Sequence, residues 1–362
     1  MKTVSKAAAI ALAVAVIATG IIFGVLNSKG LNYDISSVEN IGSSVQIISA
    51  TRDSLGIQKN GKGKFKVLMF TDVHLNGKRK EDKLAASYII KNITEVKPDL
   101  VIFGGDTISS GFNKKRTKEF VEMMDKTGVY WTAVLGNHES EGIFTFTREE
   151  FIETFISAER CLLKHEAEAG VDGYGNCTIN IFNKDGSLKE VFFLLDSGNY
   201  MTKELKEKYG VEKRGQVYDG VKESQVKWYK EQHDELTERY GSFKSIAVIH
   251  IPPYQTKDAT EKDFLYGEKN ENTCQSGFDS GLFDALKEKG STQAVYFGHD
   301  HINTFGFMHD GLLLSYIQPS GYGSYTMESS LDAPESKWLQ GCTLLTLNND
   351  GTYEAKVIYN HR

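Results

Sequence analysis

The sequence contains little proline, little cysteine and little net charge, and each shortage argues against one class of structure, partner or site. Only five of the 362 residues are proline and no compositionally biased tract occurs, which argues against long disordered regions. A formal net charge of −6 gives no indication of a nucleic-acid partner. The four cysteines lack the Cys-x-x-Cys spacing of zinc sites. They are expected to be free thiols or, in an exported protein, to offer Cys161 and Cys177 as the nearest disulfide pair.

One long hydrophobic run is present, Ala7–Leu26, and it follows Lys2 and Lys6. About twenty apolar residues in a helix match a hydrocarbon core of ~30 Å. The run exceeds the ~7–15 residues of a usual signal peptide, so it favours a retained membrane anchor over cleavage near Ala18–Gly20. The flanking lysines place the N-terminus in the cytoplasm. The rest of the chain is then expected outside the cytoplasm, anchored to the membrane or, after cleavage, secreted.

The chain divides into three parts by composition. Residues 1–30 form the N-terminal signal segment, and residues 31–63 are polar and serine-rich, which predicts a stalk with at most one edge strand at Val45–Ile48. The globular domain is expected to span residues 64–362. Its first half alternates between apolar strand-like runs and helical patterns, which implies parallel strands with crossover helices: Lys66–Phe70, Lys83–Val96, Leu100–Phe103, Thr117–Lys126 and Val129–Leu135.

The second half mixes hairpins with further strands and helices. A long helix is expected at Thr147–Glu168, and Lys184-Asp185-Gly186 predicts a hairpin between Thr178–Phe182 and Val191–Leu195. Further helices and strands follow at Ser224–Tyr240, Ser245–Ile249, Leu282–Lys289, Gln293–Phe297, Leu312–Ile317, Cys342–Leu347 and Tyr353–Tyr359. One α/β domain with two mixed sheets fits this order best.

Five short polar runs lie just beyond predicted strands: Asp72-Val73-His74, Gly104-Gly105-Asp106, Gly136-Asn137-His138-Glu139, His250, and Gly298-His299-Asp300-His301. Open α/β sheets bind ligands at the carboxyl ends of their strands. Carboxylate and amide oxygens together with imidazole nitrogens are the donors that divalent metal ions use. Two such ions about 3.5–4 Å apart can activate water and stabilise both oxygens of an in-line displacement at phosphorus. The runs therefore predict a phosphate-ester hydrolase.

The order and spacing of these runs resemble the calcineurin-like metallophosphoesterase superfamily. The resemblance implies a four-layer αββα sandwich with two mixed sheets and a pair of divalent metal ions. It assigns one ion to Asp72, His74, Asp106 and His301. The other ion would be bound by Asp106, Asn137, His250 and His299, so that Asp106 bridges the two.

A narrower similarity is to the purple-acid-phosphatase-like branch of small single-domain fungal and plant phosphatases. It is carried by Leu195–Gly198, Glu271–Cys274, Ser280–Leu286 and Gly298–Asn303. Purple enzymes have a tyrosine three residues after the bridging aspartate, where this sequence has Ser109. The resemblance therefore implies a colourless site, with manganese, iron(II) or zinc rather than a mixed iron(III) centre.

The expected chemistry is attack on phosphorus by a hydroxide held between the two ions. His138 is expected to protonate the leaving oxygen and Glu139 to orient His138. Asp300 alternates away from His299 and His301, so it is expected to support the site without binding metal.

Phosphate monoesters are the expected substrates. A phosphodiesterase or nucleotidase is the alternative, and a non-catalytic scaffold on the same fold is a remote one, because none of the ligands is missing. Substrate identity depends on loops such as Gly198–Tyr218 and Pro253–Phe278. Aromatic residues could line the cleft, although packing is their commoner role: Tyr218, Tyr254 and Tyr322.

Overall fold

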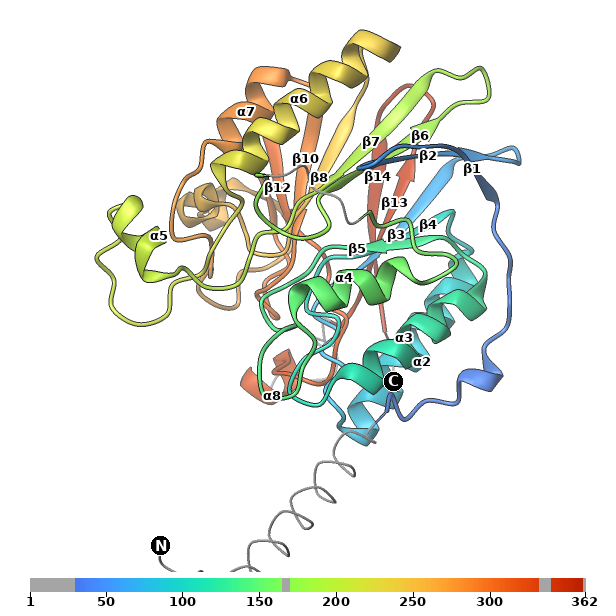
Figure 1. Ribbon diagram of the computed structural model, residues 1–362, viewed down its shortest axis with the longest axis horizontal. Helices are drawn as coiled ribbons and strands as arrows, with labels where there is room; N and C mark the ends of the chain where they lie inside the picture. Colours follow the sequence, from blue (N-terminus) through green and yellow to red (C-terminus); the bar gives the residue numbers. More distant parts are fainter. Residues whose placement is uncertain (1–29, 165–169, 332–339, 361–362) are drawn as a thin grey trace, which may run out of the picture.

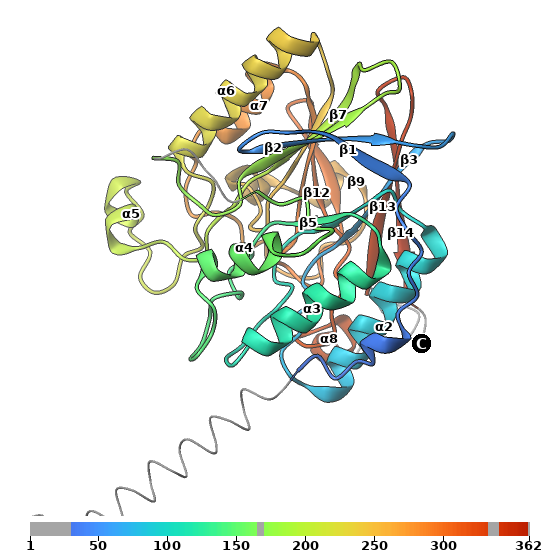
Figure 2. The ribbon, with the colours of Figure 1, turned by 45° about the vertical axis from the view of Figure 1, so that its right-hand side comes forward.

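The computed structural model describes residues 30–164, 170–331 and 340–360. These parts form two β-sheets that lie face to face, with helices on their outer sides (Figures 1 and 2). The expected membrane anchor at Ala7–Leu26 lies outside the described residues. Within the described ranges, no helix is both long enough and apolar enough to cross a membrane.

The smaller sheet has five strands in the order β14-β13-β3-β4-β5. Its parallel half comes from the predicted alternation, with helices α2 and α3 as the crossovers. The C-terminal hairpin β13–β14 adds two antiparallel strands, so the sheet is mixed. The elements are β3 (Phe65–Phe70), α2 (Arg79–Val96), β4 (Leu100–Phe103), α3 (Lys114–Thr127), β5 (Trp131–Ala133), β13 (Gly341–Leu347) and β14 (Tyr353–Tyr359).

The larger sheet has nine strands in the order β1-β2-β6-β7-β8-β10-β12-β11-β9. β7, β8, β10 and β12 run parallel to one another, and antiparallel strands flank them. The bounds are β1 (Val45–Ala50), β2 (Ser54–Lys59), β6 (Cys177–Phe182), β7 (Leu188–Leu194), β8 (Ser245–Val248), β9 (Phe264–Tyr266), β10 (Thr292–Phe297), β11 (Gly306–His309) and β12 (Leu312–Tyr316).

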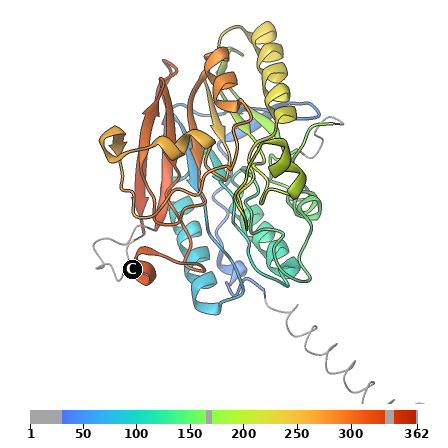
Figure 3. The same cartoon turned by 90° about the vertical axis from the view of Figure 1, so that its left-hand side faces the viewer.

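Alternate side chains of the larger sheet enter two different cores, as the two-residue period of a strand requires. Phe192 and Leu194 of β7 belong to the core shared with the smaller sheet. Phe193 belongs to the core beneath α6 (Glu223–Tyr240) and α7 (Leu282–Lys289), where its ring lies 4.7 Å from that of Tyr229. The helices α6 and α7 thus cover the larger sheet, while α2 and α3 cover the smaller one (Figure 3).

The remaining elements are short. They are η1 (Ile35–Ser37), α4 (Arg148–Ile156), α5 (Lys203–Lys208), η2 (Tyr254–Asp258), η3 (Glu261–Asp263) and α8 (Met327–Leu331). The helix expected over Thr147–Glu168 ends early, at Ile156. Beyond it, Leu162 donates to the Trp131 carbonyl at 2.7 Å, so the chain turns to pair with the beginning of β5. The four cysteines are free.

The edge strand expected at Val45–Ile48 is present within β1, but the rest of the expected stalk is wrong for the part that forms β2. This segment contributes β1 and β2, and β2 pairs in parallel with β6 from Ser54 to Gln58. Leu55 and Ile57 of β2 are 4% and 0% exposed, so the strand seals one edge of the core. The polar residues Ser54, Gln58 and Lys59 hid this strand, because they leave it with only a short apolar stretch.

Candidate metal centre

The predicted ligand runs meet where strands of both sheets end. The backbone holds them together: the Asp72 amide donates to the Gly105 carbonyl at 3.0 Å, and the His74 amide donates to the Asp106 carbonyl at 2.9 Å. The Gly298 amide similarly donates to the His250 carbonyl at 3.1 Å. Residues far apart in the sequence are therefore fixed side by side before any ligand binds.

The first group of donors consists of Asp72, His74, Asp106 and His301, all of them buried, with ligand atoms within 4.8 Å of one another. The Nε2 atoms of His74 and His301 lie 2.9 Å apart. Nε2 of His74 lies 3.6 Å from Oδ2 of Asp106, and Nε2 of His301 lies 3.6 Å from Oδ1 of Asp72. Four donor atoms thus converge on one small volume, as the sequence predicted.

The second group consists of Asp106, His250 and His299, also buried and within the same 4.8 Å limit. Nε2 of His250 lies 3.1 Å from Oδ2 of Asp106. Nδ1 of His250 lies 2.9 Å from the Gly104 carbonyl, so Nδ1 carries a proton and Nε2 is the ring nitrogen that faces the group. Asp106 belongs to both groups, which is the geometry of a bridging carboxylate.

Three buried atoms of the predicted ligands have no hydrogen-bond partner: Oδ1 of Asn137 and both ring nitrogens of His299. Oδ2 of Asp106 and Nε2 of His250 face each other. Buried polar atoms are almost always hydrogen-bonded, so this many in one place require a ligand. Hard oxygen and imidazole donors fit a divalent cation. The residues present therefore suit two metal ions that share Asp106.

Burial sets the charge state of the first group. It raises the pKa of the Asp72 carboxyl to about 7, against the opposing charge of His250. It lowers the pKa of His301 to about 4 and, together with the neighbouring His301, holds the pKa of His74 well below its usual range. Neutral imidazoles are the form that binds metal, and a cation would favour the ionised form of the carboxyl group.

The bridging carboxylate has an electrostatic partner in His250. Burial alone would raise the pKa of Asp106, but the His250 imidazole holds it well below its usual range. In turn, burial would lower the pKa of His250, but Asp106 raises it to about 10. The metal-free pair is therefore an ion pair, and a cation that takes the place of the His250 proton would release that proton to solvent.

Four of the ligands have a left-handed backbone, which non-glycine residues seldom adopt. The φ angles are 52° at Asp72, 48° at His74, 50° at Asp106 and 81° at His299. Such conformations persist only where the surroundings impose them, and they concentrate at functional sites. The conformations turn the chain sharply after each strand, so that the side chains face one another.

Two of the motif glycines leave room for the carboxylates. A Cβ atom on Gly136 would collide with the side chain of Asp106, and one on Gly298 would collide with Thr71 and Asp72. Close backbone approach therefore explains the glycine at both positions.

His138 lies at the open side of the centre, with 36% of its side chain exposed. Its backbone amide donates to Oδ1 of Asp106 at 2.8 Å, and its ring centroid lies 5.2 Å from that of His74. Nδ1 of His138 is in contact with the carboxylate of Glu141. Nε2 is thus the ring atom that can face a substrate.

The expectation that Glu139 orients His138 is wrong. The Glu139 carboxylate accepts amide hydrogen bonds from Asp106 at 3.2 Å, Thr107 at 2.6 Å and Gly136 at 2.8 Å. It therefore fixes two of the ligand turns, and Glu141 is the residue that contacts the imidazole. Sequence adjacency misled the prediction, because the chain bends after His138 and only residue 141 returns to its ring.

Asp300 is buried but lies outside both donor groups. Its carboxylate accepts from the Cys274 amide at 3.1 Å and from the Tyr316 hydroxyl. These contacts agree with the expected supporting role.

Three tyrosines border the centre, of which sequence reasoning named only Tyr218. The Tyr218 ring meets that of His299 edge-on at 4.2 Å and stacks on Tyr200 at 5.5 Å. The Tyr325 ring stacks on His301 at 4.2 Å. Tyr200 and Tyr325 were missed, since neither occurs in a ligand run. Of the other two candidates, Tyr254 contacts Lys257, and the Tyr322 ring stacks on Tyr88.

The model of the calcineurin-like phosphoesterase family matches residues 65–303. The curated relatives include the Arabidopsis thaliana protein named "Probable inactive purple acid phosphatase 14", which is 28% identical over 304 residues and covers 74% of this chain and 73% of its own. "Phosphatase DCR2" of Saccharomyces cerevisiae is 28% identical over 283 residues, or 70% of this chain and 47% of its own. These similarities confirm the predicted relation to plant and fungal purple-acid-phosphatase-like proteins.

Among solved structures, a dimetal phosphatase from Danio rerio is 14% identical, covers 81% of this chain and 98% of its own, and has a TM-score of 0.48. The family match alone spans more than half of the sequence and includes every predicted ligand. The chain therefore belongs to the calcineurin-like phosphoesterase family.

Proposed function

We propose that this protein is an active dimetal phosphoesterase that hydrolyses phosphate monoesters. The observation that supports this most strongly is the pair of buried donor groups that share Asp106, with donor atoms that have no protein partner. Inactivation in a family of this kind is expected to remove a ligand. Here each of the seven predicted ligands is present, including Asn137 with its free Oδ1.

Two divalent ions, when bound, would supply the charge that stabilises the phosphoryl oxygens and would activate the attacking water. Asp72, His74, Asp106 and His301 would hold one ion, and Asp106, Asn137, His250 and His299 the other. The oxygen and imidazole donors of these residues fit manganese, iron(II) or zinc.

His138 supplies the proton that the leaving group needs. Its Nε2 faces the open side of the centre, and Glu141 stabilises the positive charge of the ring when Nε2 is protonated. As the bond from phosphorus to the leaving oxygen breaks, the proton moves from Nε2 to that oxygen. Glu139 keeps the turns of Asp106 and Gly136 in place during this step.

The names of the relatives point in two directions, since one is called probable inactive and another a phosphatase. The decisive experiment uses the full chain, loaded in turn with manganese, iron(II) and zinc. We expect about two ions per chain and hydrolysis of p-nitrophenyl phosphate, with slower hydrolysis of bis(p-nitrophenyl) phosphate. A preference for the diester would favour a phosphodiesterase, and a chain that takes up no metal would favour a scaffold.

We also propose that Ala7–Leu26 anchors the chain in a membrane, with the phosphoesterase domain outside the cytoplasm. The length and composition of the run support this proposal. Resistance of the membrane-bound protein to alkaline carbonate, together with digestion of the domain by protease added to intact cells, would agree with it. Recovery of a shortened soluble form in the medium would instead indicate secretion.

A further inference from the structure

We propose that Tyr200 is a positioning residue whose hydroxyl orients both the proton donor and a metal ligand. Through the Glu141 carboxylate it would hold the His138 imidazole over the centre, and through Asn137 it would direct a donor oxygen into it. This inference rests on the proposed function, because it assigns a further residue to the same site.

The Tyr200 hydroxyl has a contact on each side. It accepts from Nδ2 of Asn137 at 3.4 Å. On its other side it interacts with the neighbouring Glu141 carboxylate, and burial together with this carboxylate raises the pKa of Tyr200. Glu141 in turn contacts Nδ1 of His138. Since Nδ2 of Asn137 faces Tyr200, Oδ1 of the same amide points away from it, and this buried oxygen has no protein partner. One hydroxyl therefore fixes the direction of two functional groups.

The backbone around Tyr200 is fixed as well. Between Tyr200 and Tyr218 the chain forms a loop whose two ends meet in a narrow neck. The loop contains α5, which lies at the side of the molecule (Figures 1 and 2). At this neck Tyr200 pairs with Tyr218 as an antiparallel bridge, and the Met201 amide donates to the Val217 carbonyl at 2.8 Å. A rigid neck presents the hydroxyl at a defined place.

Tyr218 provides a matched control. It lies at the same neck, its ring stacks on Tyr200 at 5.5 Å, and it also borders the centre through His299. Within the described ranges its hydroxyl makes no hydrogen bond to Glu141 or Asn137. Removal of either hydroxyl changes this side of the centre in a similar way, but only removal of the Tyr200 hydroxyl disturbs the proton donor His138.

The experiment compares the wild type, Tyr200→Phe and Tyr218→Phe as full chains loaded with zinc, on two monoesters. Phenyl phosphate needs a proton on its leaving oxygen, whereas p-nitrophenolate leaves without one. We expect Tyr200→Phe to lower kcat for phenyl phosphate by about tenfold and to change kcat for p-nitrophenyl phosphate by less than about twofold. Tyr218→Phe should leave the ratio of the two rates unchanged. An equal loss on both substrates, or no loss, overturns the assignment.

A second measurement is independent of activity. Imidazole ¹⁵N spectra of the same zinc-loaded proteins report the hydrogen bond at Nδ1 of His138, which we expect to change in Tyr200→Phe and not in Tyr218→Phe. An unchanged His138 signal in Tyr200→Phe overturns the positioning role. A zinc-loaded wild type that hydrolyses neither ester refutes the proposed function, and the spectra still decide whether Tyr200 positions His138.

Discussion

The two opposite ends of the paired sheets each bury a carboxylate, with opposite consequences. At the metal end, Asp106 lies beside imidazoles that hold its pKa low, although it is 0% exposed. At the amino-terminal end of β7, burial raises the pKa of Glu190 to about 8. Its Oε2 accepts only a 3.5 Å hydrogen bond from Gln293, and its Oε1 has no partner.

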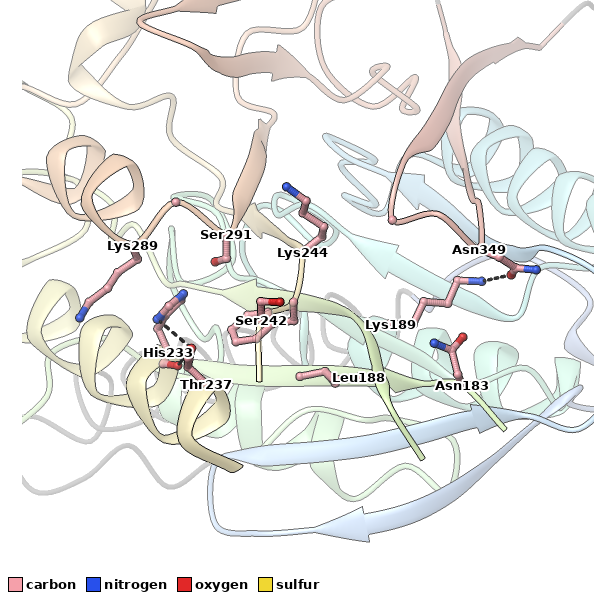
Figure 4. Close-up of a pocket in the computed structure, with 13 residues that line it drawn as sticks. Asn183, Leu188, Lys189, His233, Thr237, Ser242, Lys244, Lys289, Ser291 and Asn349 are labelled. Atoms are coloured by element: carbon pink, nitrogen blue, oxygen red, sulfur yellow. Dashed lines mark hydrogen bonds between the residues drawn. The ribbon is translucent and has the colours of Figure 1, made fainter. Parts of the chain in front are cut away.

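A surface hollow of about 450 Å³ lies at the same end as Glu190. Figure 4 shows Lys189, Lys244 and Lys289 around it on separate elements, with Lys189 joined to Asn349 and not to a carboxylate. Lys289 is already neutralised by Asp234 at 2.6 Å. Both ends thus contain charge, but among the residues that the structure describes, unpartnered donor atoms converge on one volume at the metal end alone. Convergence, and not the presence of charged residues, distinguishes a candidate catalytic site.

The largest effect is expected from Asp106→Asn. An amide cannot bridge two cations with negative charge, so we expect loss of bound metal and of detectable phosphatase activity. Metal content by mass spectrometry and hydrolysis of p-nitrophenyl phosphate check this. Wild-type turnover by the variant would show that Asp106 is not part of the metal centre, and the contrast with Glu190 would then not hold.

His138→Ala is expected to retain both metal ions, because His138 is not a ligand. Loss of a general acid should lower kcat for phenyl phosphate by roughly 10²–10⁴-fold. Steady-state kinetics beside metal analysis separate the two effects. Loss of metal from this variant would instead make His138 part of the binding group.

Glu141→Gln and Glu139→Gln separate the two acidic residues near the centre. The first should lower kcat for phenyl phosphate by about tenfold with normal metal content, since Glu141 contacts the imidazole. The second should mainly weaken metal retention, because Glu139 holds the ligand turns. Equilibrium dialysis and kinetics on both variants provide the measurement, and the reverse pattern would restore the role predicted from sequence.

Glu190→Gln tests the buried carboxyl group at the opposite end through the pH dependence of folding stability. In the folded protein the pKa of Glu190 is about 8, which is above that of an exposed glutamate. The carboxyl group of Glu190 therefore makes its full contribution to folding stability at low pH, and this contribution is lost as the pH rises from about 4.5 to about 8. The variant stays neutral, so it should gain up to ~4 kcal/mol relative to the wild type between pH 4 and pH 9. Urea unfolding at both pH values measures this gain. A pH-independent difference would mean that folding does not shift the pKa of Glu190, and a variant that loses stability at high pH would mean that Glu190 has a cationic partner.

The smallest effect is expected from Lys189→Met and Lys244→Met. Both residues line the hollow of Figure 4, far along the strands from the ligands. Metal content and kcat should stay within about twofold of the wild type, as for surface substitutions away from the site. A large loss of activity in either variant would show that the two ends are coupled.

The sequence predicted the site better than the fold around it. Each ligand follows a strand that is buried on both faces, and such strands are apolar throughout, so their ends are easy to locate. β1 was predicted in part, as an edge strand at Val45–Ile48, but β2 was missed because polar residues interrupt its short apolar pattern. The length of α4 was overestimated because helical periodicity continues past Ile156. Glu141 and Tyr200 could not be found, since their roles depend on loops that return to His138 in space.

The place of β2 beside β6 determines where the chain can be cut. A fragment that begins at Lys64 would lack both β1 and β2, and it would expose the amide edge of β6 from Thr178 to Phe182. A bare strand edge is a template for pairing with another chain, so such a fragment is expected to aggregate. Proteolysis that trims the domain should instead stop ahead of Val45. A preparation of the enzyme that omits the hydrophobic run must therefore keep residues 31–63, which the sequence predicted to be a stalk.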